Sequence, residues 1–172
     1  MRGELLAGVG LLFLAGCTLL GGVAEREKIY GKSAPVITES FASPRVKMGE
    51  NWLVYLNASD PGGDMNRIVC SVDFPAGVDH PYPVGVTKLG RDQQKNLSGY
   101  FYLPTSGLYR PVQITLTLQI QDKAGHYSPP VSFSLSIVEP SSQESRQEEP
   151  PPGIFKEENL GPFMISLTSE IG

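Results

Sequence analysis

Polar and apolar residues alternate along most of the chain between residues 34 and 138. Strict alternation of this kind is typical of a β-strand with one buried and one solvated face. Strands are therefore expected at 52–58, 97–103, 112–121 and 131–137 and, from weaker patterns, at 35–39, 44–48 and 83–88. No stretch has the apolar spacing of an amphipathic helix.

Turn-forming residues separate these segments, as in Asp60-Pro61-Gly62-Gly63 and Asp122-Lys123-Ala124-Gly125. About seven short strands joined by turns predict an all-β fold, a single antiparallel β-sandwich over residues 34–138. The alternation assigns the core to Trp52, Val54, Leu56, Cys70, Ile114, Leu116, Leu118, Phe133 and Leu135.

Two segments resemble known β-sandwich families. Gly107-Leu108-Tyr109, a long alternating strand and then Asp122 to Ser128 resemble the end of a bacterial immunoglobulin-like domain, with His126 where Asn is usual. Residues 58–64 resemble the Asp-rich turn of cadherin-like and PKD-like modules, with Gly62 in place of their middle Asp. The resemblance implies an immunoglobulin-like architecture and no particular activity.

The N-terminal residues have a different pattern, an apolar run from Leu5 to Gly16. A run of about 12 residues suits a signal peptide and is shorter than the 20 or so that span a bilayer. It ends in Leu14-Ala15-Gly16-Cys17, which resembles the lipobox of bacterial lipoproteins. The resemblance implies that residues 1–16 are removed and that Cys17 carries the lipid that holds the protein on a membrane. An ordinary signal peptide with an incidental Cys is the alternative.

The residue after the anchor bears on which membrane this is. In Gram-negative lipoproteins an Asp at that place is the usual inner-membrane retention signal, and this chain has Thr18. The resemblance therefore implies a lipid-anchored cell-envelope protein, on the outer membrane if the cell is Gram-negative. With Cys17 lipidated, Cys70 has no disulfide partner, and its alternation with Ile68 and Val72 indicates a buried apolar position.

Segments on both sides of the sandwich lack a continuous strand pattern. Residues 17–33 are expected to be the lipidated Cys and a flexible tether, and residues 139–172 an acidic, proline-rich, flexible tail. The tail ends in an apolar segment in which Phe163, Ile165 and Leu167 alternate with more polar neighbours. This pattern predicts a strand that docks on the sheet edge of a partner. Docking on its own domain and a free, disordered terminus are the alternatives.

Three carboxylates are candidates for a cation site. Asp60, Asp64 and Asp122 fall in two loops that share one end of an immunoglobulin-like sandwich, where they could converge on calcium. The alternative is that these side chains cap their own turns. No other cofactor is indicated.

Three tyrosines are candidates for a binding patch. Tyr55, Tyr100 and Tyr102 fall on the solvated side of two strands that pair in this fold, so their rings could stack on sugars or contact a protein. Cross-strand packing that stabilises the sheet is the alternative.

Charge and residue type narrow the function. A net charge of −4 with scattered Lys and Arg gives no basic surface for nucleic acid. His80 and His126 show no metal or nucleophile spacing, so catalysis is not expected. The sequence favours a lipid-anchored, non-enzymatic structural or protein-interaction module of the bacterial envelope that binds another envelope protein. A carbohydrate-binding or calcium-stabilised adhesion domain is the alternative.

Overall fold

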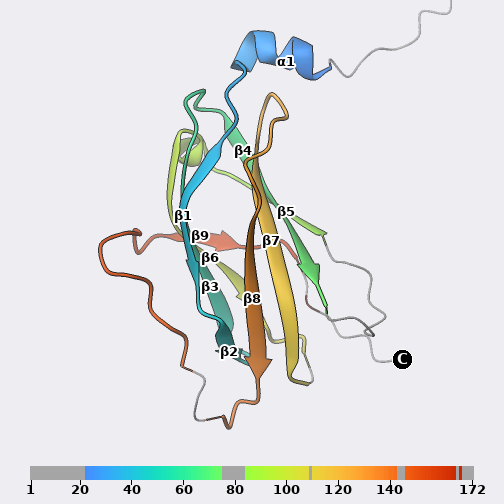
Figure 1. Ribbon diagram of the computed structural model, residues 1–172, viewed down its shortest axis with the longest axis vertical. Coiled ribbons are helices and arrows are strands. Elements are labelled where there is room, and N and C mark those ends of the chain that lie inside the picture. The colour runs from blue at the N-terminus through green and yellow to red at the C-terminus, as the bar shows by residue number, and fades with distance from the viewer. Residues whose placement is uncertain (1–21, 75–83, 109, 143–145, 166, 168–172) are drawn as a thin grey trace, which may run out of the picture.

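The computed structural model describes residues 22–74, 84–108, 110–142, 146–165 and 167. The expected signal peptide and Cys17 lie outside these residues. Figure 1 shows two β-sheets packed face to face, with a short helix at one end.

Among the described residues, one sheet has four strands and the other has five. One sheet has the order β1-β3-β6-β9 and the other the order β2-β8-β7-β4-β5. In the described residues the strands of the first sheet are β1 (Val36–Ala42), β3 (Asn51–Ser59), β6 (Asn96–Pro104) and β9 (Asn159–Pro162). Those of the second are β2 (Arg45–Lys47), β4 (Met65–Asp73), β5 (Val84–Lys88), β7 (Val112–Asp122) and β8 (Val131–Val138).

This arrangement is an immunoglobulin-like β-sandwich. The first strand is split, since β1 pairs antiparallel with β3 whereas β2 crosses to the other sheet and runs parallel to β8. The order β1-β3-β6 corresponds to strands A-B-E of that fold, and the order β8-β7-β4 corresponds to strands G-F-C. All seven strands expected from alternation are present, and β4 and β9 are additional among the described residues.

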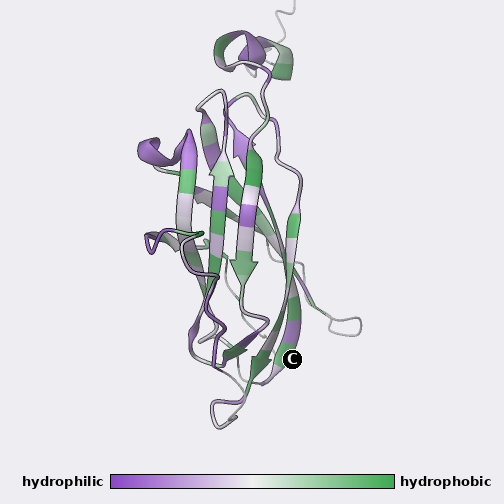
Figure 2. Cartoon of the chain, turned by 60° about the vertical axis from the view of Figure 1, so that its left-hand side comes forward, coloured by the Kyte–Doolittle hydropathy of each residue, from purple (hydrophilic) through white to green (hydrophobic). Residues whose placement is uncertain are grey.

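The core lies between the two sheets. Figure 2 shows the strands banded in alternating hydrophilic and hydrophobic colours, as the alternation requires. Eight of the nine predicted core residues are buried, and Phe133 is half-buried against the same core. Trp52 packs edge-on against Phe133 at 6.3 Å and donates from Nε1 to the Ser43 carbonyl at 2.7 Å. Burial raises the pKa of the Cys70 thiol to about 11, so it stays protonated at neutral pH.

Part of the expected flexible tether is helical. Helix α1 (Val23–Tyr30) is formed by good helix formers such as Ala24, Glu25 and Lys28 and ends at Gly31, whose φ is +92°. No residue of α1 is buried, which explains why the sequence has no helical stripe. The helix lies at the end of the sandwich opposite to the end of β8 (Figure 1).

The C-terminal tail differs most from expectation. Its described residues pack on the sandwich: β9 runs parallel to β6, with Phe101 opposite Gly161 and Tyr102 opposite Pro162. Beyond β9, Phe163 is buried and stacks on Phe101 with ring centroids 5.2 Å apart. The folded unit therefore does not end at residue 138.

β9 can pair with β6 because no other strand of the described residues occupies that edge. In an immunoglobulin-like fold strand D pairs with strand E. Here residues 89–95, between β5 and β6, hold a short 3-10 helix (Arg91–Gln93) and no strand, so β9 takes the place of strand D at the edge of β6. The C-terminal segment completes the sheet.

Two glycines within strands make room for this segment. A Cβ on Gly99 would lie 2.5 Å from the Glu158 carbonyl oxygen, and a Cβ on Gly85 would lie 2.7 Å from the Met164 carbonyl oxygen. Neither approach is possible with a larger residue. Glycine inside a strand often marks such a close backbone approach.

Candidate functional site

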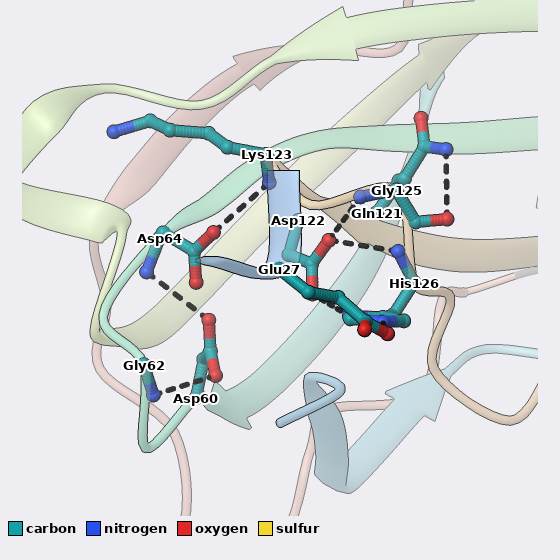
Figure 3. Close-up of polar contacts among 9 residues, drawn as sticks. All are labelled: Glu27, Asp60, Gly62, Asp64, Gln121, Asp122, Lys123, Gly125 and His126. Carbon is teal, nitrogen blue, oxygen red and sulfur yellow. Dashed lines mark hydrogen bonds and ion pairs between the residues drawn. The ribbon is translucent and has the colours of Figure 1, made fainter. Parts of the chain in front are cut away.

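The turn between β3 and β4 is built around Asp60. One of its carboxylate oxygens accepts the backbone N–H of Gly62 at 2.9 Å, and the other accepts that of Asp64 at 3.1 Å. Asp60 is 1% exposed, so this side chain holds the turn from inside. Gly63 completes the turn at φ +69°, which favours glycine. Figure 3 shows this turn beside the loop that follows β7.

Asp64 is the unusual carboxylate of this turn. Its Oδ2 accepts the backbone N–H of Lys123 at 3.2 Å, but its buried Oδ1 has no hydrogen-bond partner among the described residues. The pKa of Asp64 is raised to about 6. Burial is the largest cause, followed by a hydrogen bond with Asp60 and by the like charge of Asp60. The site therefore favours either a proton or a cation at this oxygen.

Asp122 belongs to a separate network. Its Oδ1 accepts the backbone N–H groups of Gly125 and His126, at 2.6 and 2.8 Å. Its Oδ2 lies 2.8 Å from His126 Nδ1, and His126 Nε2 lies 3.0 Å from a carboxylate oxygen of Glu27 in α1 (Figure 3). Hydrogen bonds that the His126 ring donates to the carboxylates of Glu27 and Asp122 raise the pKa of His126.

The structure thus brings together two of the three predicted carboxylates. Asp60 and Asp64 are adjacent, whereas Asp122 directs both oxygens to its own loop. Among the described residues no three His, Cys, Asp or Glu side chains group as a metal site. A third oxygen comes from the backbone: a Cβ on Gly62 would lie 2.7 Å from Asp64 Oδ1, 3.4 Å from Asp60 Oδ1 and 3.3 Å from the Tyr30 carbonyl.

Helix α1 is held against this end of the sandwich by side chains. Besides the Glu27–His126 contact, Lys123 Nζ lies 5.8 Å from the centre of the Tyr30 ring. The guanidinium of Arg26 lies over Gly125, where a Cβ would be 2.9 Å from its Nη2. The sequence pattern gave no signal for these contacts, since they depend on a helix without an apolar face.

Two of the three predicted tyrosines come together on the outer face of the first sheet. Tyr55 and Tyr100 have ring centroids 5.4 Å apart, and Phe155 of the tail lies 5.6 Å from Tyr55. Tyr102 lies further along β6, opposite Leu53. A cleft of about 580 Å³ lies between this face and the tail. Its lining comprises Leu53, Tyr55, Tyr100, Glu149, Pro150, Pro151, Pro152, Gly153, Phe155 and Glu157.

The predicted strand-docking residues lie in the sandwich of their own chain. Phe163 and Leu167 are buried, and Ile165 packs against the same core. The strand itself is Asn159–Pro162, a few residues before the expected one. Docking on its own domain is the alternative that the structure shows.

Among the described residues β5 forms one edge of the second sheet, and this edge strand carries exposed apolar side chains. Val84 and Val86 of β5 are 64% and 44% exposed, and Met164, whose backbone N–H donates to Thr87 of β5, is 66% exposed. We call Val84 and Val86 the β5 edge patch. The sequence predicted a strand at 83–88 but did not single out these two valines.

Comparisons with known proteins add little to this picture. No protein-family model matches the chain, and a search of curated proteins finds no match. Among the described residues no helix is long and apolar enough to cross a membrane.

Solved structures similar to this chain include two archaeal domains. One is the PKD domain of an M14-like peptidase from Thermoplasmatales archaeon SCGC AB-540-F20, at 10% identity and a TM-score of 0.36, covering 63% of this chain and 98% of that one. The other is the CARDB domain of a Pyrococcus furiosus protein in complex with di-metal ions, at 10% identity and a TM-score of 0.35, covering 62% and 89%.

Proposed function

We propose that this protein is a lipid-anchored, non-enzymatic interaction module of the bacterial envelope that binds another envelope protein through the β5 edge patch. The Leu14-Ala15-Gly16-Cys17 motif supports the anchor. The observation that carries the interaction is the exposure of Val84 and Val86 on an edge strand. Apolar side chains exposed next to each other on one face of an edge strand favour contact with a partner.

The other sheet edges are poorer candidates. β1 carries Glu39 and a bulge between Ile37 and Glu39, two features that discourage pairing with another chain. β2 and β9 are shorter than β5. β5 pairs with β4 on one side, and its other side faces no strand of the described residues. An extended segment of a partner can add there through main-chain hydrogen bonds, with its apolar side chains against the two valines.

Site-specific photo-cross-linking in intact cells tests this proposal. A photoreactive residue at Val86 should give an adduct with a defined envelope protein, whereas the same residue at Thr117, on the outer face of β7, should not. Adding Val84→Lys should abolish the Val86 adduct without changing the melting temperature. Adducts of equal yield from both positions, or an adduct that survives Val84→Lys, would contradict the proposal.

A second candidate function, calcium-dependent stabilisation, is favoured by the unpartnered Asp64 Oδ1. A cation beside Gly62 would contact Asp60, Asp64 and the Tyr30 carbonyl, and would tie α1 to the sandwich. Calcium takes such carboxylate and carbonyl oxygens. Saturation at 100 times the dissociation constant should stabilise the fold by about 2.7 kcal/mol. Thermal melts in calcium and in chelator measure this, and identical melting temperatures would exclude it.

A further inference from the structure

The tail crosses the outer face of the first sheet as a strap, residues 146–158, that is fixed at both ends. At its start, the Gln147 side chain accepts the N–H of Leu53 at 3.2 Å and donates to the Asn51 carbonyl at 2.9 Å. At its end, the Tyr100 N–H donates to the Glu158 carbonyl at 2.8 Å. Figure 1 shows this segment looping out beside the sheet before it returns as β9.

The middle of the strap is also tied to the sheet. Asn57 donates to the Ile154 carbonyl at 2.9 Å, and the Lys156 N–H donates to Ser98 Oγ at 3.2 Å. Three consecutive prolines, Pro150 to Pro152, stiffen the part between Gln147 and Ile154. The cleft is therefore bounded on one side by the first sheet and on the other by a strap that is hydrogen-bonded to that sheet.

The two walls of the cleft have distinct chemistry. The sheet supplies Tyr55 and Tyr100, and the strap supplies Phe155, whose ring lies 5.6 Å from that of Tyr55 at an angle of 52°. The strap also supplies Glu149 and Glu157. The lining holds no Lys or Arg among the described residues.

The carboxylates of the strap affect the ionisation of Tyr55, which lies in the cleft. Burial, the neighbouring Tyr100 and the charges of Glu157 and Glu149 raise the pKa of Tyr55. Arg146 pairs with Glu149 at 3.0 Å, but both side chains are largely exposed, so this pair offsets little of the negative potential. Glu149 and Glu157 therefore both contribute negative potential to the cleft.

We propose that this cleft binds a small organic cation of the quaternary ammonium class. The negative faces of aromatic rings attract such cations, and nearby carboxylates add to the attraction. A sugar would gain stacking on a ring face but nothing from the two negative charges. This site is independent of the β5 edge patch, which lies on the other sheet, so either proposal can fail alone.

Choline and its neutral isostere 3,3-dimethylbutan-1-ol are matched probes, since they differ in charge and hardly in shape. The full chain, solubilised in a non-ionic polyoxyethylene detergent, is titrated with each and followed by amide chemical shifts. Choline should shift residues of the cleft and saturate in the millimolar range, as expected for a few cation–π contacts. The isostere should not saturate.

Two pairs of variants connect the binding to named residues. Glu157→Gln should weaken choline binding about three- to tenfold, whereas Glu158→Gln, which removes the same charge one residue away, should not. Phe155→Ala should weaken it as well, and Ile154→Ala should leave it unchanged. Equal binding of choline and its isostere, equal effects of the two Glu variants, or saturation by cellobiose in place of choline would overturn the proposal.

Discussion

At neutral pH the side chain of Asp64 opposes folding. Its pKa of about 6 in the native state lies above the ordinary 3.8, so the native state holds this proton more tightly than the unfolded chain does. The contribution of Asp64 to stability is therefore fully present below pH 3.8 and is lost as the pH rises through about 6. Above that pH the buried charge beside Asp60 is a cost.

Asp64→Asn should remove this cost. The amide can donate to Asp60 while its oxygen still accepts the Lys123 N–H, so the variant should be more stable than the parent at pH 7.5 by about 1–3 kcal/mol. The gain should disappear near pH 4. Urea unfolding in chelator at both pH values measures it, with the exposed Asp73→Asn as control. A gain that is the same at both pH values would show that the charge of Asp64 is not its cause.

His126 connects the sandwich to α1 through Glu27. Because its native pKa is raised, its stabilising effect is fully present below pH 6.5 and is lost as the pH rises through the native pKa. Glu27→Gln should lower the pKa of His126 in an NMR titration and speed amide exchange in α1. Glu25→Gln, on the same helix, should do neither, and equal shifts from the two variants would rule out the contact.

The C-terminal segment is the element whose contribution to the fold is most easily measured. Phe163 is 2% exposed and its neighbour Met164 is 66% exposed. Phe163→Ala should cost about 3–5 kcal/mol of unfolding free energy, because it leaves a cavity against Phe101. Met164→Ala should stay within about 0.5 kcal/mol. Urea unfolding of the two variants decides, and two equally small losses would mean that the segment is not docked in solution.

The same segment shows what sequence reasoning can and cannot reach. The alternation of polar and apolar residues predicted which face of each strand is buried, because the buried face must be apolar. The core residues could therefore be predicted as well. The location of β9 did not, because Asn159–Pro162 has no alternation of its own. The signals for it were indirect: Gly85 and Gly99 inside strands, and a short connection between β5 and β6 in which no strand was predicted.

For the candidate sites, the sequence predicted the residues in the turns and strands, but not the residues of α1 and of the strap that contact them. Asp60 and Asp64 were predictable from turn chemistry, whereas the Tyr30 carbonyl and the Glu27 carboxylate come from a helix without a sequence signature. Tyr55 and Tyr100 were predictable from strand phase. Phe155 and Glu157 were not, because their place depends on how the strap is tied across the sheet.

For the whole molecule, the proposed anchor and the domain geometry belong together. α1 follows Cys17, the proposed lipid attachment site, in the chain, and it lies at one end of the sandwich while β8 ends at the other (Figure 1). In a protein held by Cys17, both the β5 edge patch and the strap cleft lie on the folded domain beyond the tether. The envelope role that we propose therefore depends on this anchor.

Metabolic labelling with palmitate and cell fractionation of the parent protein and Cys17→Ser test that role most directly. The parent should incorporate label and sediment with membranes, and Cys17→Ser should do neither, because one thiol carries the attachment. The variant should keep the melting temperature of the folded domain. A parent protein that takes up no label, together with a Cys17→Ser variant that still sediments with membranes, would contradict the account.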